Sequence, residues 1–309
     1  MQTLISVILP VFILIGFGYL AAWRGYFSAS NVDGLMRFAT NFAVPVLLFR
    51  AISTLDLAAE YNSALLGSFY SAALICFLTG MLGAKYLFGR DWEDATAIGF
   101  VCLFSNSLLL GLAIMERAYG ENSLTGNYAI ISIHAPFCYG LGIATMEIMR
   151  ARHSSKARIV PTVLKAMFSN ALIMGIALGF VVNLGKIPMP DPLTHAVNLL
   201  ASAALPAALF GMGGVLFRYR PEGDMRTILF CCAVSLGLHP ALTVAFGAWS
   251  SLSVDNMRSA VVTASMAPGI NAYLFANMYG RAMRVAASTV LIGTAFSVIT
   301  IWLWLGALP

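Results

Sequence analysis

Long apolar stretches separated by short polar segments run through the whole chain. Each stretch is close to the roughly 20 residues that a helix needs to cross the hydrocarbon core of a bilayer. The pattern predicts ten membrane-spanning helices, at residues 4–23, 34–53, 63–88, 95–115, 127–149, 163–184, 193–217, 227–250, 258–278 and 284–307. The expected fold is therefore an all-α membrane protein.

Composition agrees with this prediction. The 309 residues are 60% hydrophobic and only 10% charged, whereas soluble domains carry about 25% charged residues. All five cysteines lie inside apolar stretches, away from any cluster of metal-ligand type, so we expect no metal site and no cofactor. The first residues lack the basic segment of a signal peptide, so we expect the first stretch to be a retained span.

The distribution of Lys and Arg predicts how the helices are oriented, because cytoplasmic loops carry an excess of these residues. With the N-terminus outside, fourteen of the eighteen fall on the inner side: Arg24, Arg37, Lys85, Arg90, Arg150, Arg152, Lys156, Arg158, Lys165, Arg218, Arg220, Arg226, Arg281 and Arg284. The four on the outer side are Arg50, Arg117, Lys186 and Arg258. Both termini are then expected outside. The net positive charge is explained by the excess of Lys and Arg on the inner side of the membrane. It therefore does not indicate a nucleic-acid partner.

The chain divides into two halves of five predicted helices. Residues 1–150 form the first and 163–309 the second, joined by a basic cytoplasmic linker at 151–162. An odd number of helices in each half makes the second enter from the opposite face, as in the inverted repeats of many transporters. Internal similarity supports the division, since Gly18 and Gly179, and likewise Pro45 and Pro206, differ by 161.

The fourth and ninth predicted helices, which correspond under this repeat, each carry a signal for a break. Ser105, Asn106 and Ser107 are consecutive near the middle of the fourth helix. The ninth contains Ala267-Pro268-Gly269-Ile270-Asn271. Ser and Asn favour helix caps, while Pro removes a backbone donor and clashes with the preceding turn. Interrupted helices at matching positions of two repeats indicate a substrate site near the middle of the membrane.

The chemistry expected at such a site is anion binding. A half-helix that begins inside the membrane presents free N–H groups and the positive end of its dipole, which attract carboxylates. We expect Asn106, Ser107 and Asn271 to add hydrogen bonds. In the alternative interpretation, the Ser/Asn cluster only joins helices and Pro268 only bends one.

Other polar residues inside the spans are weaker candidates. His134 in the fifth span and His239 in the eighth could bind a carboxylate or carry a proton, or each could be a packed histidine bonded to a carbonyl. Tyr139 could line the cavity or pack as an aromatic core residue. No Asp or Glu is expected at mid-depth, which weakens mechanisms that use a carboxylate relay or a carboxylate-bound sodium ion.

Several motifs, taken in order, resemble those of one family. They are residues 41–49 in the second span, Ser105-Asn106-Ser107 with Gly111 in the fourth, 169–172 followed by Gly179 in the sixth, 204–213 in the seventh and 266–268 in the ninth. The chain resembles, over essentially its whole length, a bacterial member of the auxin efflux carrier family, which includes the plant PIN carriers and malonate-transporter-like proteins.

The resemblance implies a scaffold domain of helices one, two, six and seven, which can form a homodimer contact. It implies a transport domain containing the broken helices four and nine, and elevator-like carriage of small organic anions across the bacterial cytoplasmic membrane. The chain departs from the family where Ser105 replaces a common proline and Ala113 replaces a second one. The first break is expected to be softer for that reason.

Three classes of function are compatible with a helical membrane protein: a carrier, a channel and an intramembrane enzyme. The favoured one is a secondary transporter of small organic anions, carboxylates such as malonate or auxin-like acids, with substrate at Ser105, Asn106, Ser107, Pro268, Gly269, Asn271, His134 and Tyr139. A sodium- or proton-coupled symporter of larger anions, of the bile-acid-transporter type, is the alternative. An anion channel is disfavoured because no filter motif or repeated pore charge is present, and an intramembrane enzyme because no catalytic set is. The coupling ion stays open.

Overall fold

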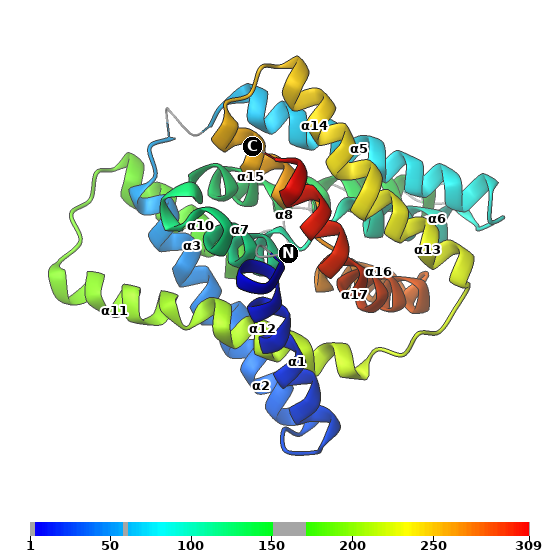
Figure 1. Ribbon diagram of the computed structural model, residues 1–309, viewed down its shortest axis with the longest axis horizontal. Coiled ribbons are helices and arrows are strands. Elements are labelled where there is room, and N and C mark those ends of the chain that lie inside the picture. Colours follow the sequence, from blue (N-terminus) through cyan, green and yellow to red (C-terminus); the bar gives the residue numbers. More distant parts are fainter. Residues whose placement is uncertain (1–3, 58–60, 151–170, 309) are drawn as a thin grey trace.

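The computed structural model describes residues 4–57, 61–150 and 171–308, and within these ranges its regular elements are helices (Figure 1). The first half comprises η1 Leu4–Ile8, α1 Leu9–Trp23, α2 Ala29–Phe38, η2 Ala39–Ala43, α3 Val44–Thr54, α5 Ser63–Tyr86, α6 Trp92–Leu103, η3 Ser107–Gly111, α7 Leu112–Tyr119, η4 Glu121–Ser123 and α8 Thr125–Arg150. The second comprises α10 Ala171–Leu184, α11 Asp191–Ser202, α12 Ala204–Arg218, α13 Met225–Ala233, η7 Val234–Leu238, α14 His239–Trp249, α15 Val254–Ala264, α16 Ile270–Tyr279 and α17 Met283–Ala307.

Seven helical segments in the described ranges are long and apolar enough to cross a membrane. They are Ile5–Trp23, Ala29–Thr54, Ser63–Tyr86, Thr125–Arg150, Asp191–Arg218, Met225–Trp249 and Met283–Ala307. The all-α membrane fold is thereby confirmed, whereas the count of ten stays a prediction. The sixth predicted span is represented by the shorter α10, and the fourth and ninth each by two short helices. The linker 151–162 and the residues of the sixth span before Ala171 lie outside the described residues.

Two prolines inside spans are accommodated by π-helical turns. Pro45 follows η2 near the start of α3, and Pro240 follows η7 near the start of α14. Proline lacks an N–H and its ring clashes with the carbonyl four residues earlier. A wider turn before each proline removes that clash, so the second and eighth spans continue across the membrane without a break.

The helices pack in two groups. The first contains α1, α2, α3, α10, α11 and α12, with α1 against α12 and α3 against α10. The second contains α5, α6, η3, α7, α8 and α13–α17, with α5 against α6 and α14. Figure 1 shows α1, α2 and α12 together in the lower part of the view and α5 and α14 in the upper part. The two groups meet through few elements, among them η3 against α12 and α3 against α8.

Glycines permit the closest approaches in the first group. A Cβ on Gly18 of α1 would overlap the backbone oxygen of Phe210 on α12. A Cβ on Gly179 of α10 would lie 3.0 Å from the backbone oxygen of Phe49 on α3. Such backbone contact is typical of small residues at membrane helix interfaces. The two contacts match each other, because Phe210 follows Phe49 by the same 161 residues that separate the glycines.

Ion pairs separate into the two sets that the topology predicts. Arg281 contacts Asp91 and Glu93, and Arg150 also contacts Glu93, so four residues predicted at the inner face lie together. At the other end, Arg50 of α3 contacts Glu121 of η4. In the described part of the chain, none of the ion pairs joins residues predicted on opposite faces. The distribution fits a bundle with one charge-rich and one charge-poor end.

Candidate functional site

Both predicted breaks are present, and each leaves a short stretch of extended backbone. α6 ends at Leu103, and the helix resumes at Ser107 as η3 and continues as α7. α15 ends at Ala264, and the helix resumes at Ile270 as α16. The replacement of proline by Ser105 does not restore the first helix, because Phe104 and Asn106 both leave the helical region of φ/ψ space.

The two extended stretches pair with each other as a minimal antiparallel bridge between Ser105 and Pro268. Asn106 N donates to Ala267 O at 2.8 Å, and Gly269 N donates to Phe104 O at 3.0 Å. These bonds satisfy backbone groups that the broken helices leave free inside the membrane. Pro268 occupies the position between the two bonds, where a residue needs no N–H toward its partner strand. The breaks therefore cross and bind each other directly.

A cavity of about 980 Å³ reaches this crossing. Seven of the eight predicted site residues line it: Ser105, Asn106, Ser107, His134, Tyr139, Gly269 and Asn271. Pro268 does not line the cavity, and contributes through its place in the bridge. We call this space the crossing cavity. Its volume falls in the range that accommodates small-molecule ligands.

Two half-helices begin at the wall of the crossing cavity. Neither Asn106, before η3, nor Gly269, before α16, makes a side-chain capping hydrogen bond. The first backbone N–H groups of a helix have no partner within it, and they carry the positive end of its dipole. Because Ser107, Leu108 and Ile270 line the cavity, these groups lie next to any ligand that enters it.

The amide of Asn271 is oriented by Tyr139. The Tyr139 hydroxyl donates to Asn271 Oδ1 at 3.3 Å. Since the amide oxygen is engaged, the two N–H donors on Nδ2 are left for a ligand. Asn106 is held differently: its Nδ2 donates to the thioether of Met212 on α12 at 3.3 Å. Sulfur is a weak acceptor, so a carboxylate can replace it on this donor.

The two predicted histidines differ in their relation to the site. His134 is 3% exposed, lines the cavity, packs edge-on to Phe104 with ring centroids 4.8 Å apart, and bonds to the backbone at Ser105. The ring of His134 therefore packs against the extended backbone of the first break. His239 does not line the cavity; its ring packs against Phe69, and its Nε2 has no hydrogen-bond partner among the described residues.

Several lining residues were not among the predicted site residues. Arg37, Thr40 and Asn41 lie on one face of α2 and η2 along the cavity, and Arg218 lines it while bonded to Asp33 at 2.7 Å. Within the described ranges, Arg37 forms no ion pair. The charged side chains of the lining, Arg37, Arg218 and Asp33, together carry one net positive charge. The spacing of 37, 40 and 41 is that of one helix face, and a search for polar stripes inside predicted spans could have found them.

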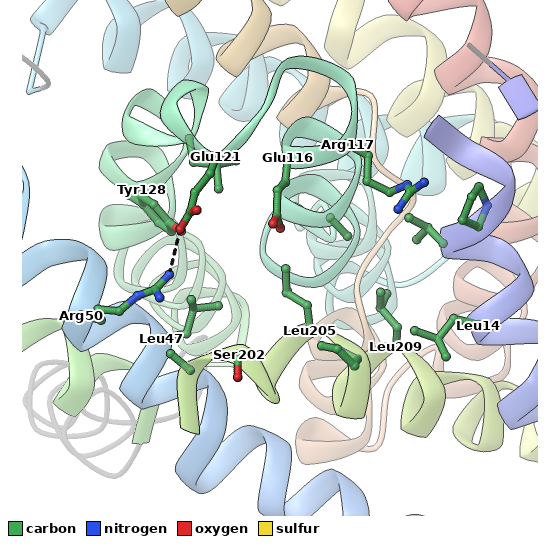
Figure 2. Close-up of a pocket in the computed structure, with 16 residues that line it drawn as sticks. Leu14, Leu47, Arg50, Glu116, Arg117, Glu121, Tyr128, Ser202, Leu205 and Leu209 are labelled. Carbon is green, nitrogen blue, oxygen red and sulfur yellow. Dashed lines mark hydrogen bonds and ion pairs between the residues drawn. The ribbon is translucent and has the colours of Figure 1, made fainter. Parts of the chain in front are cut away.

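A second cavity of about 470 Å³ lies at the charge-poor end of the bundle (Figure 2). Its polar wall contains Arg50, Arg117, Glu116, Glu121 and Tyr128, and its apolar wall includes Leu47, Leu205 and Leu209. Figure 2 shows the Glu121 carboxylate directed to the Arg50 guanidinium and Glu116 between the two arginines. We call this space the arginine vestibule. In the sequence, the arginines of this cavity served only to predict the orientation of the helices.

Broken helices that cross beside a cavity are typical of one class, the multi-pass membrane transporters. A family described as "Membrane transport protein" matches residues 3–305. The chain belongs to this family, the auxin efflux carriers, and is a transporter, not an enzyme.

Three relatives cover nearly the whole chain. It is 25% identical to a "Putative malonate transporter" of Rhizobium meliloti, covering 97% of this chain and 94% of the relative. It is 20% identical to "Uncharacterized transporter YfdV" of Escherichia coli, covering 96% and 95%. It is also 20% identical to "Auxin efflux carrier component 5" of Arabidopsis thaliana, covering 95% and 93%.

Proposed function

We propose that this protein is a secondary transporter of small organic anions and that the crossing cavity holds the substrate carboxylate. The observation that carries the proposal is the meeting of two uncapped half-helices in one cavity, with the Asn271 donors turned to it by Tyr139. Backbone N–H groups, amide donors and net positive lining all favour a negative ligand. Relatives named for malonate and auxin transport are consistent with a carboxylate.

Transport proceeds in this proposal by alternating access. The second helix group carries the crossing and moves against the first, which serves as the scaffold and as a homodimer contact. The small number of elements that join the groups supports such movement. An inverted repeat of residues 1–150 and 163–309 supplies the two access states. Support for the repeat comes from the matched contacts of Gly18 with Phe210 and Gly179 with Phe49.

The cellular setting follows from the same proposal. The charge-rich end, with Arg37 and Arg218 at the crossing cavity, faces the cytoplasm, and both termini lie outside the cytoplasmic membrane of a bacterium. The cavity then opens inward in this structure. Coupling to a proton, to sodium or to the membrane potential alone stays open. A proton-coupled mechanism predicts a pH dependence of uptake that shifts in the variant His134→Gln.

Uptake of radiolabelled malonate by proteoliposomes tests the proposal. We expect saturable uptake by the wild type and its loss in Asn106→Ala/Asn271→Ala, because both side-chain donors for the carboxylate are gone. A matched control is Asn277→Ala, which removes an exposed amide further along α16 that does not line the cavity. Unchanged kinetics in the double variant, with normal insertion, would contradict the assignment of the site. Competition by other mono- and dicarboxylates then defines the substrate class.

A further inference from the structure

We propose that the arginine vestibule is a second binding site for the carboxylate of the same substrate class, in which a ligand carboxylate replaces Glu121 on Arg50. This inference rests on the proposed function, and it concerns a different cavity from the crossing. The vestibule has a volume of about 470 Å³, enough for a small organic acid. It contains both charged groups and an apolar wall, as a carboxylate with a carbon skeleton requires.

The first argument is the distribution of positive charge. Only four of the eighteen Lys and Arg residues are predicted on the charge-poor face. Two of these four, Arg50 and Arg117, line the same cavity. A face otherwise low in Lys and Arg thus places two of its three arginines around one small space. Arginine is the side chain best suited to bind a carboxylate through two parallel hydrogen bonds.

The second argument is the way Arg50 is paired. Its Nη2 lies 3.4 Å from Glu121 Oε1, and a side-chain hydrogen bond joins Arg50 to Tyr128. The Glu121 side chain is 70% exposed, whereas that of Arg50 is 30% exposed. Exposed pairs of this kind contribute only about 0–1 kcal/mol. The carboxylate of Glu121 can therefore leave for solvent at low cost while Arg50 stays in the wall.

Arg117 supplies a fixed positive charge beside this exchangeable pair. Its Nη2 donates to Ser6 O at 2.7 Å and its Nε to Val7 O at 3.2 Å, both in η1. Carbonyl oxygens orient the guanidinium but do not neutralise it. With Glu121 displaced, Arg50, Arg117 and Glu116 together carry one net positive charge. One carboxylate group of a ligand can then bind at Arg50.

The apolar wall completes the site. Leu47, Leu205 and Leu209 line the side of the vestibule opposite the acidic residues (Figure 2). These leucines can cover the carbon skeleton of a bound acid while Arg50 holds its carboxylate. A purely inorganic anion would gain nothing from this wall, so the vestibule favours organic acids.

The test measures binding of radiolabelled malonate to purified protein that carries Asn106→Ala/Asn271→Ala, so that the crossing cavity no longer contributes. In this background, Arg50→Gln should reduce affinity at least about tenfold. Glu121→Gln should raise it by about two- to fivefold, because the competing carboxylate is gone. Lys186→Gln removes another charge predicted on the same face, outside the vestibule, and should change nothing.

A lower malonate affinity in Arg50→Gln together with a higher affinity in Glu121→Gln supports the replacement of Glu121 by a ligand carboxylate. The inference is overturned if malonate binding in this background is absent, is insensitive to Arg50, or shifts in the same direction in both variants. The proposed function is tested separately by uptake through the protein with an intact crossing, so the two ideas can fail independently.

Discussion

The crossing cavity and the arginine vestibule share three lining elements, α3, α8 and α12, but recognise charge in different ways. α3 contributes Leu48 to the first and Leu47 to the second. α12 contributes Val215 to the crossing cavity and Leu209 to the vestibule. At the crossing, the recognition groups are half-helix starts and amides, whose charge is partial and fixed. In the vestibule the recognition groups are fully charged side chains that already form ion pairs or hydrogen bonds. The first arrangement suits a dehydrated ligand, and the second suits one still in contact with solvent.

A thin apolar layer separates the two cavities. Leu209, Met212 and Val215 lie three residues apart on one face of α12. Leu209 lines the vestibule and Val215 the crossing cavity, whereas Met212 lines neither and is 1% exposed. Leu110 of η3, at 0% exposure, belongs to neither lining. The crossing cavity is therefore closed toward the vestibule.

Cysteine labelling should give the largest contrast between the two cavities. Val215→Cys and Leu209→Cys place a thiol in the crossing cavity and in the vestibule, only six residues apart. We expect a membrane-impermeant maleimide to label one of the two positions in right-side-out vesicles and the other in inside-out vesicles. All five native cysteines are buried, so the wild type provides the background. Labelling of both positions from one side would show that the cavities are continuous.

A smaller effect should separate Asn271 from the tyrosine that orients it. Asn271→Ala removes donors to a charged ligand, which contribute about 1.5–3 kcal/mol, so we expect malonate affinity to fall about ten- to a hundredfold. Tyr139→Phe removes only the hydroxyl that bonds to Asn271, and should cost about fivefold. Isothermal titration of both variants measures the difference. Equal losses would mean that Tyr139 contacts the ligand itself.

The smallest effects should come from ion pairs at the charge-rich end. Glu93 accepts from Arg150 at 3.0 Å and from Arg281 at 2.9 Å, and Glu93→Gln should lower stability by about 1 kcal/mol. The exposed pair of Arg284 and Glu222 spans 3.9 Å, so Glu222→Gln should have no measurable effect. Thermal unfolding in detergent compares the two. A larger loss in Glu222→Gln would show that distance and exposure do not rank these contacts.

Much of the crossing was predictable because its signals are local. A run of Ser and Asn inside an apolar span, and Pro-Gly at the matching position, are unfavourable within a continuous membrane helix. Sequence spacing cannot show that Ser105 and Pro268 pair as backbone strands, since that contact joins residues 163 apart. The vestibule escaped prediction for the same reason: Arg50 and Arg117 belong to different helices, and their proximity arises from tertiary packing.

The bridge between Ser105 and Pro268 has a thermodynamic consequence. Its two backbone hydrogen bonds tie both half-helix starts together, so their spacing would stay constant in the proposed movement of the crossing as one body. In the proposed alternating-access mechanism, a ligand bound there would meet the same groups at the same distances in both states. We therefore expect equal intrinsic affinity at the two faces of the membrane. The carrier would then be half-saturated at similar substrate concentrations on the two sides of the membrane.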